Sequence, residues 1–399
     1  MTRRTHDVAE AATLPQTYAD HAVAAYTAMQ QSMYAPDGTS LYTETAPATG
    51  NPYSYLWPLS RALIGTLALA GVPAALVSGA NYRSAVQDRL AGLAKYWDGA
   101  AAVPAYDSYV VAPLGGGGDK YYDDNAWVSL ALIQQYRMGL TTSLEAPKQL
   151  FKFAQLGWDR TAKDPDAGGV FWVQQSAGFG LSNHDRGAGA SAGSAEVGFH
   201  LHELTGSSTY DGDGQVVAQP RSIGALNMVN WVARYLDSSR TGSGPFLNVV
   251  RQDGSIDTNV WSYNQGVMIG AKVLQYRLTR QSAALRQAEA IARQALTTFG
   301  DFTGQPPSFN TMCFQNMLML HAVTSDATLR ANMLQAMQRY ADWTWDSATG
   351  ARDANNLFYF NDGGRPALGS QAARLQDQGA MMQLYSLLAW NAADYGKLT

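Results

Sequence analysis

The chain repeats one pattern along most of its 399 residues: apolar residues recur at helical spacing in about twelve segments. Turns rich in glycine and proline separate these segments, and none of the turns is long enough to be an interdomain linker. Alternating, strand-like runs are short, as in Gly168–Val173. The pattern therefore predicts a mainly helical protein with one domain. The expected helices span residues 18–33, 54–71, 81–98, 123–139, 143–158, 188–206, 222–239, 262–279, 282–299, 309–323, 326–345 and 371–394.

These segments alternate between two kinds. Every second one starts with a polar or aromatic cluster and then becomes small and apolar on nearly all sides, as in residues 123–134 and 189–201. The segments between them are amphipathic, and residues 282–299 carry Arg286, Glu289 and Arg293 on the polar face. About six helical hairpins with an inner and an outer helix explain this alternation. Because neither end hairpin resembles a polar cap, we expect a closed α/α toroid and not an open solenoid.

The composition excludes several classes of protein. With 28 basic and 32 acidic residues the formal charge is −4, which argues against a nucleic-acid binder that uses a basic surface. The hydrophobic fraction of 46% allows a large buried core. Cys313 is the only cysteine, so an intramolecular disulfide and a zinc site with several thiolates are excluded. We expect no metal and no cofactor.

The sequence contains no targeting segment that we recognise. Arg3 and Arg4 are followed by residues interrupted by charge, where a signal peptide needs an apolar run of about 7–15 residues. No stretch reaches the ~18 uninterrupted apolar residues of a membrane span. We expect a monomer without a membrane span, either cytoplasmic or secreted after removal of a leader.

Two adjacent carboxylates are the strongest indication of chemistry. Asp123 and Asp124 open an otherwise apolar helix directly after the glycines at 115–118, and Tyr121, Tyr122 and Trp127 flank them. An ordinary role would be helix capping. Glycoside hydrolysis, however, needs one protonated and one ionised carboxyl group. Repulsion between neighbouring carboxylates raises one pKa while a helix N-terminus lowers the other, so this pair suits that reaction.

The segment YYDDNAWVSLALIQQY, residues 121–136, resembles the signature of glycoside hydrolase family 76, the endo-α-1,6-mannanases. The resemblance runs from about residue 50 to residue 300, while residues 182–188 and 309–314 depart from the family pattern. Further segments that resemble the family in the same order are Leu56-Trp57-Pro58, Gly168–Trp172, Leu204-Thr205-Gly206 and Ser262–Val267.

The resemblance implies a fold and a reaction. The fold is a single-domain (α/α)6 barrel over residues 1–399, an all-α toroid of six helical hairpins. The reaction is retaining hydrolysis of internal α-1,6-mannosidic linkages in a mannan-type polysaccharide. By resemblance, Asp123 is the nucleophile and Asp124 the acid/base.

Aromatic residues are plentiful, with 10 Trp and 21 Tyr, and many lie near the starts of the inner helices. Sugars stack on aromatic rings through their apolar faces, although each ring could equally pack in the core. The expected partner is a polysaccharide or oligosaccharide. The residues expected to contact it are Tyr55, Trp57, Tyr122, Asn125, Trp172, Asn183, Tyr263 and Asn264.

Other motifs carry weaker predictions. Gly189–Gly193 matches G-x-S-x-G, but no strand precedes it as a nucleophile elbow requires. His200 and His202 are too close in sequence to share a helix face, so we expect core or hydrogen-bonded histidines and no metal pair. Asp211–Gly214 lacks the glutamate of a calcium loop, so we expect a turn. A different α/α-toroid protein remains the alternative: another α-glycan hydrolase, a sugar epimerase or a non-catalytic glycan binder.

Overall fold

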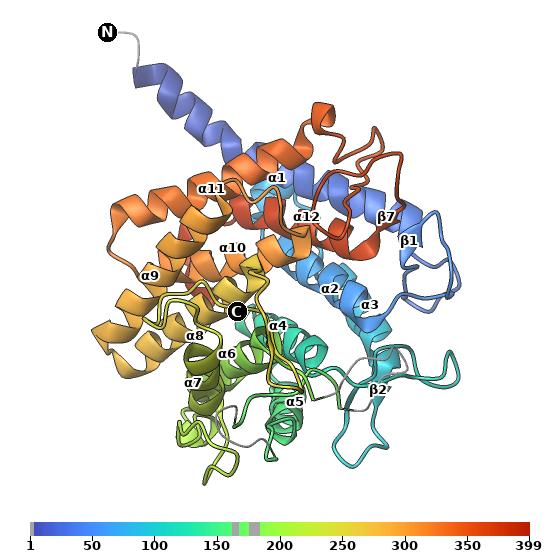
Figure 1. Cartoon of the computed structure of the whole chain (residues 1–399). Coiled ribbons are helices and arrows are strands. Elements are labelled where there is room, and N and C mark those ends of the chain that lie inside the picture. Colours follow the sequence, from blue (N-terminus) through green and yellow to red (C-terminus); the bar gives the residue numbers. More distant parts are fainter. Residues whose placement is uncertain (1–3, 162–166, 175–183) are drawn as a thin grey trace. The chain divides into compact units, whose positions relative to one another are not determined.

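The computed structural model describes residues 4–161, 167–174 and 184–399, with side chains from residue 14 onward (Figure 1). All twelve predicted helices are present in this part of the chain, and most of their ends lie within five residues of the predicted ones. α1 is the exception, because it begins at Arg4. The helices are α1 (Arg4–Met33), α2 (Leu56–Ala70), α3 (Arg83–Leu93), α4 (Tyr122–Arg137), α5 (Glu145–Leu156), α6 (Ala188–Thr205), α7 (Ala225–Tyr235), α8 (Ser262–Thr279), α9 (Ser282–Phe299), α10 (Pro307–His321), α11 (Ala327–Trp345) and α12 (Leu375–Ala389).

The strands of the described residues are two residues long and pair antiparallel. β4 and β7 lead directly into α6 and α12, so these small sheets lie at the N-terminal ends of inner helices. The predicted strand-like run at 168–173 forms isolated bridges with neighbouring segments. The pairs are β1 (Thr45–Ala46) with β7 (Ala373–Arg374), β2 (Trp97–Asp98) with β3 (Ala105–Tyr106), and β5 (Val249–Val250) with both β4 (Arg186–Gly187) and β6 (Ile256–Asp257).

Burial confirms the alternation of inner and outer helices. Every residue of α6 from Ala188 to Leu201 is buried, as is every residue of α12 from Asp377 to Ala389. In α9 the buried residues form one stripe that leaves the rest of the helix accessible. Helices buried on all sides need apolar or small residues all round, which is the pattern that marks the inner helices in the sequence. The stripe in α9 consists of Ala284, Ala288, Ile291, Ala292 and Ala295.

The chain groups into two compact units. The first comprises Met1–Ala94, Asp301–Thr311 and Leu334–Tyr395. Within it α12, the last inner helix, packs against α2, the first. Gly65 and Gly379 allow this contact, since a Cβ on Gly65 would lie 2.5 Å from the carbonyl oxygen of Gly379. Neighbouring first and last inner helices are a feature of closed helical rings.

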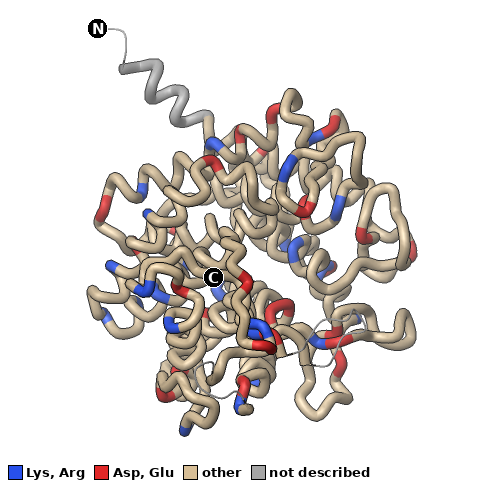
Figure 2. The backbone as a smooth tube through the Cα atoms, viewed as in Figure 1, with Lys and Arg blue, Asp and Glu red and all other residues tan. Residues whose placement is uncertain are grey.

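The second unit comprises Lys95–Gly300, Met312–Met333 and Gly396–Thr399. Its inner helices α4, α6 and α8 are neighbours in that order, and each packs against the outer helix that follows it. Figure 2 shows Lys and Arg interspersed with Asp and Glu along the described chain. No helix of the described residues is long and apolar enough to cross a bilayer. The predicted organisation as one domain stays a prediction.

Candidate active site

The candidate catalytic carboxylates lie in the first turn of α4, in the second unit. The chain is extended at Tyr121 and enters the helix at Tyr122. The Tyr122 backbone N–H donates to the carbonyl oxygen of Trp172 at 2.9 Å, and Tyr121 forms an antiparallel bridge with Val173. The segment Gly168–Trp172 therefore runs beside the start of α4, which brings Trp172 close to Asp123.

Asp123 and Asp124 are half-buried and have different electrostatic environments. Asp123 Oδ1 accepts the backbone N–H of Asp124 at 3.0 Å, and its carboxylate accepts a hydrogen bond from the Trp172 side chain. Burial raises the pKa of Asp123 to about 6, and these hydrogen bonds limit the rise. Burial and then the charge of Asp123 raise the pKa of Asp124 well above its usual range. The two shifts therefore favour an ionised Asp123 beside a protonated Asp124.

Tyr263 of α8 also lies near the carboxylate pair. Tyr263, the second residue of α8, lies near enough to Asp123 that burial and the carboxylate charge raise the pKa of the phenol. Its hydroxyl donates to Asn248 Oδ1 at 3.1 Å, and Asn248 Nδ2 donates to Asp257 Oδ2 at 2.8 Å. The sequence does not mark Asn248 and Asp257 as candidates, because they belong to short strands and loops without a motif.

Asn264, which we predicted to contact substrate, borders the same network. It is fully buried, and its Nδ2 lies 3.5 Å from Asn248 Oδ1. Its Oδ1 is buried without a hydrogen-bond partner among the described residues. In this conformation Asn264 supports the residues around Tyr263, and its contact with substrate stays a prediction.

Asn125 has a structural role, and its contact with substrate stays a prediction. It is 1% exposed, and its Oδ1 accepts the backbone N–H of Tyr106 at 2.9 Å. Its Nδ2 donates to the carbonyl oxygens of Tyr106 at 3.0 Å and Tyr121 at 2.9 Å. The amide thus clamps β3 to the start of α4, and both of its N–H groups are used.

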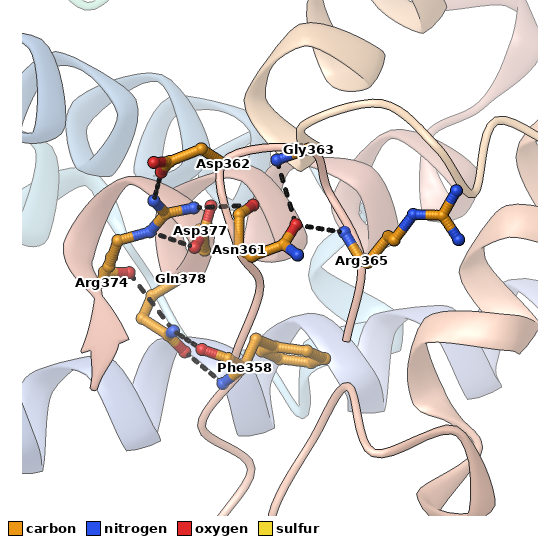
Figure 3. A network of polar contacts seen from close by, with 8 residues as sticks. All are labelled: Phe358, Asn361, Asp362, Gly363, Arg365, Arg374, Asp377 and Gln378. Carbon is orange, nitrogen blue, oxygen red and sulfur yellow. Dashed lines mark hydrogen bonds and ion pairs between the residues drawn. The ribbon is translucent and has the colours of Figure 1, made fainter. Parts of the chain in front are cut away.

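Two other inner helices carry the same amide clamp at their fourth residue. Gln265 of α8 binds both backbone groups of Phe246, at 2.8 and 2.9 Å. Gln378 of α12 binds both backbone groups of Phe358, at 3.0 and 2.8 Å (Figure 3). Since Asn125 has the same place in α4, these amides hold the preceding loops against the inner helices. An amide at the fourth helix residue thus recurs in α4, α8 and α12 as a structural feature.

The clamp of α12 is preceded by a buried carboxylate, Asp377, at the helix position that Asp124 has in α4. Arg374 Nε donates to Asp377 Oδ2 at 2.9 Å, and the same guanidinium pairs with the exposed Asp362 (Figure 3). Burial raises the pKa of Asp377 to about 6, and Arg374 opposes this rise. An Arg–Asp pair at a helix start is typical of ordinary capping, so the sequence alone does not mark this carboxylate as functional.

Tyr122 likewise belongs to the core. It is 4% exposed, and its ring stacks on Phe153 with centroids 4.4 Å apart and an interplanar angle of 19°. A Cβ on Gly157 would lie 2.7 Å from the Tyr122 ring, so that glycine makes room for it. The Tyr122 ring therefore packs α4 against α5, and its contact with sugar stays a prediction.

Two predicted aromatic contacts lie in the first unit. Tyr55 is 41% exposed, and its hydroxyl accepts a hydrogen bond from Asn51 Nδ2 at 3.1 Å. The Trp57 ring is partly exposed, and the buried Arg61 guanidinium lies 5.4 Å from its centroid. Both stay predictions as substrate contacts. Asn183 lies outside the described residues.

The competing motifs have structural explanations. Ser191 is fully buried within α6, and its Oγ accepts the backbone N–H of Val170 at 3.0 Å, so it is not on a nucleophile elbow. Asp213 accepts the backbone N–H groups of Gln215 at 3.0 Å and Arg221 at 2.8 Å, and so stabilises its loop.

His200 and His202 both have hydrogen-bond partners, as predicted for core or hydrogen-bonded histidines. His200 is buried with its Nδ1 2.8 Å from Arg137 Nη2, and His202 Nδ1 lies 2.8 Å from Asp211 Oδ1. Within the described part of the chain, no group of three or more His, Cys, Asp or Glu could hold a metal ion.

Comparison with known proteins shows similarity over most of the chain. The model of glycosyl hydrolase family 76 matches residues 17–385, which extends beyond the region of resemblance in the sequence. No curated protein matches the chain. A GH76 α-mannanase from Bacteroides thetaiotaomicron has a similar structure, with a TM-score of 0.75 at 18% identity, covering 93% of this chain and 95% of that chain.

Two further solved structures are similar. A family 76 mannosidase from B. thetaiotaomicron VPI-5482 has a TM-score of 0.74 at 19% identity, covering 94% of this chain and 98% of that chain. The GH76A α-1,6-mannanase from Salegentibacter sp. HEL1_6 has a TM-score of 0.68 at 16% identity, covering 93% and 99%. An inactive variant of that enzyme, with two consecutive aspartates replaced by asparagine, was solved with α-1,6-mannotriose.

The structural likeness establishes the fold, and the family model establishes the family. Structures of this family are (α/α)6 barrels, and the mainly helical chain matches them over 93% of its length. The predicted fold class and the predicted resemblance are therefore confirmed. The chain belongs to glycosyl hydrolase family 76 and is a glycoside hydrolase.

Proposed function

We propose that this protein hydrolyses internal α-1,6-mannosidic linkages of a mannan-type polysaccharide with retention of configuration, using Asp123 as nucleophile and Asp124 as acid/base. The observation that carries the proposal is the carboxylate pair at the N-terminus of α4, whose members differ in proton affinity. The Salegentibacter α-1,6-mannanase supports it, because replacement of two consecutive aspartates gives an inactive variant that was solved with α-1,6-mannotriose.

The reaction follows from the protonation of the pair. Asp124 donates its proton to the glycosidic oxygen while the Asp123 carboxylate attacks the anomeric carbon, so the C–O bond breaks and a glycosyl ester forms. Asp124, now ionised, takes a proton from water, which attacks the ester and releases Asp123. The hydrogen bonds from Trp172 and from the Asp124 backbone stabilise the Asp123 carboxylate before attack and after release.

The proposed substrate contacts are aromatic side chains, together with the polar side chain of Asn264. Trp172 and Tyr263 are partly exposed and lie next to Asp123, one by a hydrogen bond and the other by its electrostatic effect. Tyr55 and Trp57 are the proposed stacking platforms of the first unit. These rings suit the apolar faces of pyranose sugars.

Product analysis tests the substrate and the linkage. The purified protein is incubated with unbranched α-1,6-mannan and with α-1,2- and α-1,3-linked mannans. We expect only the α-1,6-mannan to be shortened to a ladder of oligosaccharides. Cleavage of another α-glycan would contradict the sugar or the linkage, and release of mannose alone would contradict internal cleavage.

Stereochemistry tests the mechanism. Retention requires carboxyl groups about 5–5.5 Å apart, whereas inversion leaves about 6.5–9.5 Å for a water molecule. We expect proton NMR to detect the α-anomer first. A β-anomer appearing first would mean that Asp123 is not a nucleophile and that another carboxylate acts as base.

Substitution tests the two roles. We expect Asp123→Ala and Asp124→Ala each to lower kcat by roughly 10³-fold or more while the unfolding temperature stays near that of the wild type. Azide should partly restore Asp124→Ala on an aryl mannoside with a good leaving group, because that leaving group departs without protonation and azide attacks the glycosyl ester without a general base. Asp326→Ala, which removes an ion pair with Arg293 at the start of α11, is the matched control and should keep wild-type kcat.

A further inference from the structure

The Tyr263 ring is held from two inner helices. A Cβ on Gly189 of α6 would lie 2.8 Å from Tyr263 Cε2, so only glycine leaves room for the ring there. Trp127 of α4 meets the ring edge-on, with centroids 6.4 Å apart and an interplanar angle of 86°. Gly193 gives the Trp127 ring the same room, because a Cβ there would lie 2.9 Å from it. The two glycines of the G-x-S-x-G motif in α6 therefore leave room for the Tyr263 and Trp127 rings.

The Tyr263 hydroxyl is oriented by a chain of two hydrogen bonds. A phenol has one hydrogen, and here it is donated to Asn248 Oδ1 at 3.1 Å. The Asn248 amide has a defined direction, because its Nδ2 donates to the Asp257 carboxylate at 2.8 Å and a flipped amide would set two oxygens against each other.

The backbone of the same pair is fixed as well. The Asn248 N–H donates to the carbonyl oxygen of Asp257 at 3.1 Å, and the Ala188 N–H at the start of α6 donates to the carbonyl oxygen of Asn248 at 2.9 Å. Asn248 directly precedes β5, and Asp257 ends β6. The β4–β5–β6 sheet therefore holds Asn248 in place behind Tyr263.

The charges around Tyr263 keep the phenol neutral. After burial, the carboxylates of Asp123 and Asp257 are the causes that raise its pKa. Because its hydrogen is directed to Asn248, the Tyr263 oxygen can interact with a sugar hydroxyl beside Asp123 only by accepting a hydrogen bond.

We propose that Asn248 and Asp257 are positioning residues that orient the Tyr263 hydroxyl as a hydrogen-bond acceptor for a hydroxyl group of the pyranose that undergoes cleavage. This inference rests on the proposed glycosidase site, and it deepens it by requiring a substrate hydroxyl as donor at this position. It does not depend on which sugar or linkage is cleaved.

A double-mutant cycle tests the inference, with kcat and KM measured on whichever α-glycan the wild type cleaves best. Tyr263→Phe removes the acceptor oxygen, and we expect it to lower kcat/KM about tenfold or more. Asn248→Ala should cause a similar loss in the wild type but no further loss in Tyr263→Phe, since it acts through that hydroxyl. Asn230→Ala, which removes one bond to the carbonyl oxygen of Gly214 at 2.9 Å, is the matched control and should leave kcat/KM unchanged.

A charge swap gives a second readout that a loss of folding would not imitate. Asn248→Asp alone sets two carboxylates against each other and should lower kcat/KM, whereas adding Asp257→Asn restores a donor between them and should recover most of the activity. Additive losses in the cycle, unchanged kinetics of Tyr263→Phe or failure of the swap to recover activity would each overturn the inference. A wild type without activity on any glycan would instead contradict the proposed function.

Discussion

Glu196, in the middle of α6, is a buried acid outside the candidate site whose surroundings predict its protonation state. Its Oε1 and the Oδ1 of Asn316 on α10 lie 1.8 and 1.9 Å from the same point, the position of a Cβ on Gly270 of α8. The two oxygens are therefore no more than 3.7 Å apart. Both are buried without another hydrogen-bond partner in the described chain, and Asn316 Nδ2 is directed to the carbonyl oxygen of Met312 at 3.2 Å.

Two acceptors this close are stable only if one carries a hydrogen, so we predict that Glu196 is a neutral acid that donates to Asn316. Burial raises the pKa of Glu196 well above its usual range. A carboxyl group with a raised folded-state pKa contributes its full stability below the unfolded-state pKa. That stability is lost as the pH rises from there to the folded-state pKa, at about 1.4 kcal/mol for each pH unit.

The test compares Glu196→Gln with the wild type in thermal unfolding from pH 5 to pH 8. Glutamine donates an N–H to Asn316 at every pH, so the advantage of the variant should grow with pH by roughly 2 °C per unit. Glu145→Gln, at a side chain that is 80% exposed, is the control and should show no such trend. A difference between Glu196→Gln and the wild type that stays constant or shrinks as the pH rises would refute the reasoning.

Three further predictions concern the candidate site. Because Asp123 must be ionised and Asp124 protonated, kcat/KM should fall below about pH 6, where Asp123 takes up a proton, and again at higher pH where Asp124 loses one; a pH–rate profile with only one limb would contradict this. Asn125→Ala should lower the free energy of unfolding by about 2 kcal/mol in urea, since it leaves buried backbone groups of β3 unpaired, and a stability equal to the wild type would contradict the clamp. Gly189→Ala should lower kcat by displacing the Tyr263 ring, whereas Gly116→Ala, with open space at its Cβ, should leave kcat unchanged. Equal kcat values for the two variants would contradict the role of Gly189 in making room for Tyr263.

The helices could be predicted because their information is local. The apolar periodicity of α9 and the all-round apolar character of α6 mark an outer and an inner helix without reference to any partner. The carboxylate pair was also visible in the sequence, since Asp123 and Asp124 are adjacent and open a helix that is otherwise apolar.

The roles of their neighbours were not visible, because a residue type does not reveal which partner it meets. Asn125 follows the pair directly, yet its amide is used by Tyr106, nineteen positions earlier in the chain. Tyr122 precedes the pair, yet its ring is covered by Phe153. Both assignments depend on which face of α4 meets α5 and β3, and that is set by packing between segments.

The sequence by itself determined the family, the order and kind of the helices, and the carboxylates that open α4. Only the tertiary structure decided which polar groups surround them. Trp172 donates a hydrogen bond to Asp123, and Asn248 and Asp257 form a hydrogen-bonded chain with Tyr263. The physical reason is range. Helical periodicity and capping act within a few residues, whereas hydrogen bonds that orient a side chain at the site join strands and loops far apart in the chain, and folding alone brings those together.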